Sequence, residues 1–254
     1  MKVDMPMPDD PNAFTPMDRD LPSHECLPPP ATANDEPVES PKPIREFNRR
    51  TIFISGVLLE LLIAGIASVI LLLFPQSYAQ LNWSLQPSIW LIGISGTLPL
   101  LLLFWLVQKY HWTAFRSLEQ VKEDILLPML RASTYFDILL YSILAGVCEE
   151  LLFRGVIQTA LSSPLSPIGA ILLSNLLFGL VHPLGWVYIL AVAFIGCYLG
   201  LLLWWTQSIV VVMLVHGLYD FIVMLSLKRE ADGFAVPAPL TSASDAKEQI
   251  EELK

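Results

Sequence analysis

Residues 185–227 read GWVYILAVAFIGCYLGLLLWWTQSIVVVMLVHGLYDFIVMLSL, and this stretch decides the fold. It contains one formally charged side chain, Asp220. A helix needs about 20 residues to cross the roughly 30 Å of bilayer hydrocarbon, so the stretch can supply two such helices. Its apolar runs are continuous, whereas the strands of a membrane β-barrel alternate between apolar and polar residues. The expected fold class is therefore all-α, as a polytopic membrane helical bundle.

The composition of the whole chain supports an integral, multi-pass membrane protein. Hydrophobic residues make up 54% of the 254 residues and charged residues 15%, with a mean hydropathy of +0.56, which is more apolar than a soluble domain requires. The net charge of -9 is concentrated in the two tails, and we expect no nucleic-acid partner. The three cysteines are widely separated and show no CxxC spacing, so neither a disulfide scaffold nor a zinc knuckle is indicated.

The chain divides by composition into two tails and a membrane region. Residues 1–44 hold eleven of the twenty prolines and many acids, which is typical of disordered chain, and residues 229–254 form a second tail. Between them, residues 45–133 are expected to contain two transmembrane helices and a cytoplasmic connector, and residues 134–228 a four-helix core. About six transmembrane helices are predicted, near 52–74, 88–107, 134–161, 166–182, 185–205 and 208–227.

Lysine and arginine residues test this count, because they gather in cytoplasmic loops. They precede the first predicted helix, fill the loop between the second and third, and follow the last, which places both termini in the cytoplasm. The loop from Trp112 to Leu126 interleaves apolar and charged residues. This pattern suits either a helix lying in the membrane interface or a solvated connector.

Three short motifs place ionisable residues in or beside the apolar stretch: EELLFR at 149–154, FGLVH at 178–182 and HGLYD at 216–220. Glu150 and Arg154 are four residues apart, in the favourable order for an ion pair on one helical face. Glu149 points about 100° away from Glu150 and is left free by that arginine.

The same spacing puts Phe178 and His182 on one face, and His216 and Asp220 on another. From the rise of an α-helix, Glu149, His182, His216 and Asp220 lie at similar membrane depths and could share one cavity. Buried charge is expensive in a bilayer, which favours an active site there.

The order and separation of these motifs resemble the CPBP family of CAAX proteases and bacteriocin-processing intramembrane proteases, also called Abi, which is related to the Ras-converting CAAX endopeptidases. The resemblance covers about residues 134–227. It implies hydrolysis of a peptide bond within the membrane. Glu149 would activate a water with help from His182, while His216 and Asp220 would polarise the scissile carbonyl or hold the oxyanion. Glu150, Arg154 and Phe178 would support the site. The last position of the third motif is often Asn in this family, and Asp220 can donate a hydrogen bond only when protonated.

No cofactor is favoured, although zinc is an open alternative. If zinc were bound, its ligands would be Glu149, His182 and His216. The chain has no HExxH motif, and its two motif histidines lie on different predicted helices. The implied substrate is a peptide or a membrane protein, prenylated or unmodified.

Two other function classes fit a membrane protein with buried acids. A non-catalytic scaffold or bacteriocin-immunity factor of the same fold would keep the helices, and an ion or proton transporter would also place acids and histidines at mid-membrane. Transporters usually show internal repeats with paired helix breaks, and none is evident here. Glu60, in the first predicted helix, matches none of the motifs and has no assigned role.

Overall fold

The computed structural model describes residues 47–75, 81–110 and 113–233, so both predicted tails lie largely outside the described residues. The described residues are helical, without strands, which confirms the all-α class. The elements are α1 (Arg49–Leu73), α2 (Pro87–Tyr110), η2 (Thr113–Phe115), α3 (Arg116–Val121), η3 (Lys122–Leu126), α4 (Leu127–Ala132), α5 (Tyr135–Glu150), η4 (Leu151–Gln158), α6 (Thr159–Leu161), α7 (Pro167–Leu180), α8 (Trp186–Thr206) and α9 (Ile209–Gly233).

Within the described residues, four helices are long and apolar enough to cross a membrane: α1, α2, α8 and α9. Large apolar side chains such as Leu58 and Leu62 of α1 are about 60% exposed, as expected for a surface that faces lipid. The protein is therefore an integral membrane protein. The other two predicted spans are a shorter apolar helix, α7, and the continuous run α5–η4–α6, so the count of six remains a prediction.

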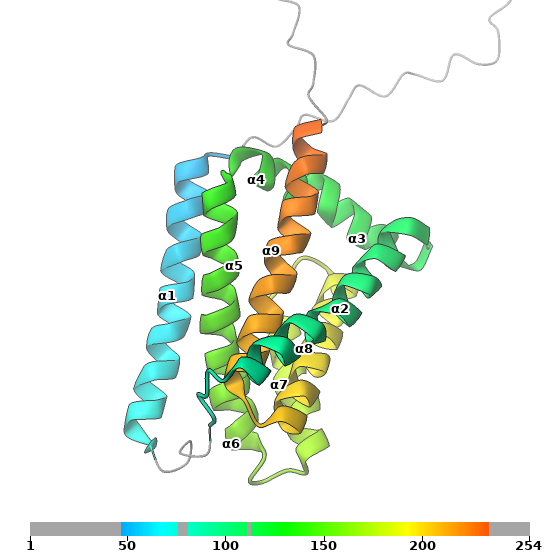
Figure 1. Ribbon diagram of the computed structural model, residues 1–254. Coiled ribbons are helices and arrows are strands. Elements are labelled where there is room, and N and C mark those ends of the chain that lie inside the picture. The colour runs from blue at the N-terminus through cyan, green and yellow to red at the C-terminus, as the bar shows by residue number, and fades with distance from the viewer. Residues whose placement is uncertain (1–46, 76–80, 111–112, 234–254) are drawn as a thin grey trace, which may run out of the picture. The chain divides into compact units, whose positions relative to one another are not determined.

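Helices α1 and α5 run side by side in the same direction, and polar contacts fix their register (Figure 1). The Arg49 guanidinium donates to both carboxylate oxygens of Asp137 at 2.7 and 2.9 Å. One turn further along, the Tyr141 hydroxyl donates to the carbonyl of Ile52 at 2.9 Å. Asp137 also closes a capping box with Thr134, so the same carboxylate caps the start of α5 and binds α1.

Helix α9 packs against α5 at a crossing made of two glycines, Gly146 and Gly217. A Cβ atom added to Gly146 would lie 2.7 Å from the Gly217 backbone nitrogen and 2.8 Å from the Met213 carbonyl oxygen. Only a glycine allows this approach. The crossing brings the end of α5, with Glu149 and Glu150, next to His216 of α9. Packed against the other side of α9, α2 and α8 contribute to a core of leucine, isoleucine and valine side chains.

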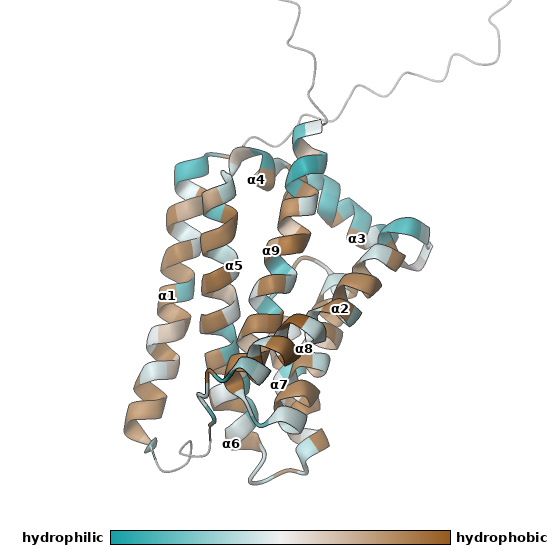
Figure 2. Ribbon diagram, in the orientation of Figure 1, coloured by the Kyte–Doolittle hydropathy of each residue, from teal (hydrophilic) through white to brown (hydrophobic). Residues whose placement is uncertain are grey.

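Hydrophilic residues gather at the end of the bundle where α4 and the end of α9 meet (Figure 2). There Arg131 donates to the carbonyl of Ala231 at 2.8 Å, and Lys122 pairs with Glu230 at 3.1 Å. Lys228 pairs with Asp232 one turn further along α9 at 2.6 Å. Because of these contacts α9 continues to Gly233, and the expected tail from residue 229 is helical over its first five residues.

The connector between α2 and α5 is a chain of short helical pieces, η2, α3, η3 and α4. Its apolar residues Val121 and Leu130 are buried against the bundle. Trp112, part of the predicted interfacial pattern, lies outside the described residues. Whether the connector lies in the membrane interface stays a prediction.

Candidate active site

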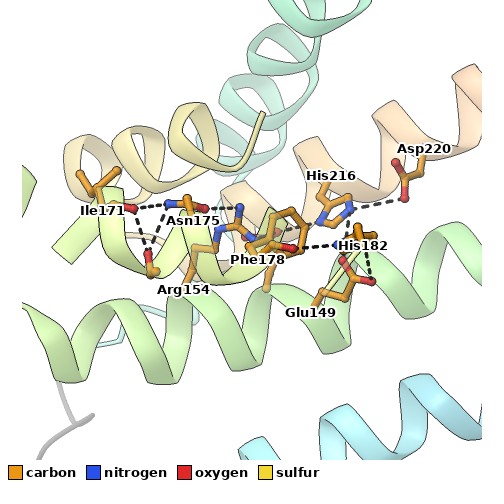
Figure 3. A network of polar contacts seen from close by, with 10 residues as sticks. Glu149, Arg154, Ile171, Asn175, Phe178, His182, His216 and Asp220 are labelled. Atoms are coloured by element: carbon orange, nitrogen blue, oxygen red, sulfur yellow. Dashed lines mark hydrogen bonds and ion pairs between the residues drawn. The ribbon is translucent and has the colours of Figure 1, made fainter. Parts of the chain in front are cut away.

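A buried polar network links the first motif to α7. Glu150, Arg154 and Asn175 are each 0% exposed. The Arg154 guanidinium donates to Glu150 Oε1 and to Asn175 Oδ1, both at 2.8 Å (Figure 3). The Asn175 amide in turn donates to the Ile171 carbonyl at 2.7 Å. The predicted ion pair between Glu150 and Arg154 is thus present, and it also ties the end of α5 to α7.

The chain turns into a π-helix, η4, immediately after Glu150. Single π-helical turns inside longer helices are rare and occur frequently at functional sites. Here the Thr159 hydroxyl donates to the Arg154 carbonyl, five residues earlier, at 3.0 Å. The segment holds Arg154 at full burial between α5 and α7.

Glu150 has a second partner that its sequence spacing does not indicate. The Nδ1 atom of His216 lies 2.7 Å from Glu150 Oε1. One carboxylate oxygen therefore contacts both Arg154 and His216, and it fixes which ring nitrogen of His216 faces the rest of the site. The 66-residue separation explains why local periodicity could not reveal this contact.

The four side chains predicted to share a cavity do lie together (Figure 3). The Nε2 atom of His216 is 3.9 Å from Glu149 Oε2 and 3.4 Å from Asp220 Oδ2. The Nε2 atom of His182 is 3.9 Å from Glu149 Oε1. The Nδ1 atom of His182 lies 2.8 Å from the Phe178 carbonyl oxygen, so its Nε2 atom is directed to Glu149 as well. One carboxylate from α5 is thus flanked by imidazoles from the α7–α8 turn and from α9.

Phe178 lies at the centre of these contacts and is 3% exposed. The Arg154 guanidinium lies 4.3 Å from the centre of its ring, within the range of a cation–π interaction. The ring also meets His182 edge-on at 4.9 Å and His216 at 6.2 Å between centroids. Phe178 therefore packs against the Arg154 guanidinium and against both histidines.

The site opens into a cavity of about 750 Å³. One end is lined by Glu149, His182, His216 and Asp220. The lining continues along apolar side chains of α2, α8 and α9 to the connector, where Glu119 and Lys122 take part. Its walls are mostly apolar, as in pockets for small apolar ligands or extended apolar chains.

Zinc stays an alternative prediction, with Glu149, His182 and His216 as its ligands. Among the described residues, no three His, Cys, Asp or Glu side chains stand close enough to hold one ion together. The two histidine Nε2 atoms are each 3.9 Å from a Glu149 oxygen, a separation that two zinc bonds of about 2.0–2.2 Å could just span.

Sequence reasoning missed Asn175, which is fully buried within apolar α7. A buried amide in an apolar helix is a usable signal, because it requires hydrogen-bond partners. Gly196 of α8 faces it: an added Cβ would overlap Asn175 Oδ1 and lie 2.9 Å from Arg154 Nη2. This glycine makes room for the polar network.

The segment that carries the three motifs is similar to a known protein family. Residues 131–222 match the model of a family described as type II CAAX prenyl endopeptidase, Rce1-like. The matched segment contains all three motifs, and it confirms the family resemblance drawn from them. Searches among curated proteins and among solved structures found no match.

Proposed function

Since the chain carries an Rce1-like segment of the CAAX-protease family, whose members are intramembrane endopeptidases, we propose that it hydrolyses a peptide bond using a water activated by Glu149. The observation that carries this proposal is the placement of Glu149 between two histidine Nε2 atoms, at the end of an otherwise apolar cavity. The Glu150 carboxylate is hydrogen-bonded to Arg154 and His216, so Glu149 is the carboxylate of this pair that is available as a base.

The separation of 3.9 Å between Glu149 and each histidine is too long for a direct hydrogen bond and suits a bridging water. Glu149 would take a proton from this water while the oxygen attacks the scissile carbonyl carbon. The resulting tetrahedral intermediate carries an oxyanion. Its C–N bond then breaks, and Glu149 returns the proton to the leaving amine. General-base catalysis of this kind contributes about 10²- to 10⁴-fold.

The two histidines would act differently because their ring nitrogens face different groups. Both nitrogens of His216 face carboxylate oxygens, of Glu150 and Asp220, so a protonated ring can donate an N–H bond to each. This suits His216 to hold the oxyanion, with Asp220 orienting its ring. The Nδ1–H of His182 donates to the Phe178 carbonyl, which leaves its Nε2 as an acceptor for a water proton.

The cavity supports a substrate with an extended apolar part. It runs from the catalytic groups along α2, α8 and α9 to the connector. A transmembrane segment of a membrane protein or a prenylated peptide would bury such a chain there, with its scissile bond beside Glu149. The two termini of the protein would lie in the cytoplasm, on the side where the basic residues meet.

A matched set of purified proteins tests the proposal. Wild type, Glu149→Gln and His182→Ala would be incubated in detergent with a fluorogenic peptide library, with and without a chelator. Cleavage by wild type alone that survives chelation supports glutamate catalysis. Loss of cleavage on chelation, with recovery on adding zinc, would move the mechanism to a metal. Absence of cleavage by all three would favour a non-catalytic scaffold.

A further inference from the structure

Glu60 is a buried carboxyl group within apolar α1 that the proposed reaction does not use. Glu60 is only 9% exposed, and its Oε2 atom is buried without a hydrogen-bond partner. Within the part of the chain that the structure describes, no salt bridge reaches it. An acid in a membrane helix is costly unless a neighbouring group or a task accounts for it.

The register of α1 against α5 brings Glu60 to the active site. Arg49 contacts Asp137, and Ile52 contacts Tyr141, with separations of 88 and 89 residues between two helices that run in the same direction. The same offset places Glu60 opposite Cys148 and Glu149. In Figure 3 the pale blue ribbon of α1 runs beside the part of α5 that carries Glu149.

Glu60 and Glu149 are both buried where α1 packs along α5 and η4, so this register sets the two carboxyl groups against each other. Two ionised carboxylates can only accept hydrogen bonds, so a bond between them requires a proton on one of the two. If Glu149 is to act as the base, the hydrogen-bond donor is Glu60.

We propose that Glu60 is a positioning residue whose carboxyl O–H donates a hydrogen bond to Glu149 and holds its carboxylate toward His182 and His216. This inference rests on the proposed function, in which Glu149 is the base. Each Glu149 oxygen faces one of the two histidines, and a hydrogen bond from the α1 side would fix the carboxylate in that orientation. Helix α1 would then be part of the catalytic machinery, although the family match begins only at residue 131.

Two substitutions of Glu60 separate a hydrogen-bond donor from a space-filling side chain. Glu60→Gln keeps a donor of the same length, while Glu60→Met keeps the volume and removes the donor. Leu62→Ala, on the lipid-facing side of the same helix, is the control. We expect Glu60→Met to lower kcat by about 10- to 100-fold with little change in KM, because a displaced catalytic group loses its alignment. Glu60→Gln should stay within about fivefold of wild type, as for one altered hydrogen bond.

The outcomes distinguish this inference from the proposed function. Equal kcat for Glu60→Met and Leu62→Ala would overturn the positioning role, provided Glu149→Gln is inactive in the same assay. A Glu60→Gln enzyme as slow as Glu60→Met would overturn it too, because donor geometry alone would not restore activity. If Glu149→Gln were as active as wild type, the proposed function itself would fail. Thermal unfolding of each variant checks folding, and Glu60→Leu provides a second apolar variant.

Discussion

The first prediction concerns Arg154, whose removal should unfold the site without touching the proposed base. In Arg154→Met the Glu150 carboxylate loses its 2.8 Å partner while remaining 0% exposed. Removing one member of a buried ion pair costs about 3–5 kcal/mol when the other charge stays buried, and the remaining contact of Glu150 with His216 at 2.7 Å places the expected loss at the lower end. The Asn175 oxygen also loses its donor, and the Phe178 ring loses its cation. Total stabilities of about 5–15 kcal/mol make this loss a large fraction.

The assay is denaturant or thermal unfolding in detergent, with two reference variants. Glu150→Gln combined with Arg154→Met removes both charges and should recover part of the loss, because replacing a whole buried pair is often close to neutral. Glu149→Gln should change stability by less than about 1 kcal/mol, since its contacts to the histidines are 3.9 Å long. An Arg154→Met protein as stable as wild type would show that the buried pair does not stabilise the fold. A double variant less stable than the single one would show that the unpaired Glu150 charge is not the cause of the loss.

Other predictions follow from single contacts. Gly146→Val should separate α5 from α9 and lower activity at least about tenfold, because its Cβ would lie 2.7 Å from the Gly217 nitrogen. Leu62→Val is the control. Normal activity of Gly146→Val would contradict the close crossing of the two helices. Asn175→Leu should destabilise the protein by about 1–3 kcal/mol in the same unfolding assay, as a buried guanidinium N–H loses its acceptor, and an unchanged unfolding curve would count against the network. Chelation should leave cleavage unchanged, and recovery by added zinc after loss would contradict metal-free chemistry.

The sequence alone predicts the all-helical class, and it predicts that the motif residues lie close together. Apolar runs predicted where the helices lie, and the spacing of Glu150 and Arg154 predicted their ion pair. The rise of an α-helix predicted that His182 and His216 reach the level of Glu149, as the distances of 3.9 Å bear out. These features depend on local geometry, which a sequence states directly.

The features that sequence reasoning could not reach depend on the packing of distant segments. The contact of His216 with Glu150 requires the close crossing of α5 and α9 at Gly146 and Gly217. No sequence pattern predicts that these two glycines pack against each other. The π-helix after Glu150 has no period that distinguishes it from an α-helix in a short apolar run. The sequence shows Glu60 as an acid within an apolar helix, but only the register of α1 against α5 relates it to Glu149.

The kcat of Glu149→Gln in proteoliposomes, measured beside wild type on a peptide that wild type cleaves, tests whether Glu149 is the catalytic base. Unfolding curves of the two proteins would be recorded in parallel. We expect a loss of about 10²- to 10⁴-fold in kcat with an unchanged unfolding curve, because the substitution removes only the base. A folded Glu149→Gln protein that cleaves the peptide as fast as wild type would contradict this role of Glu149.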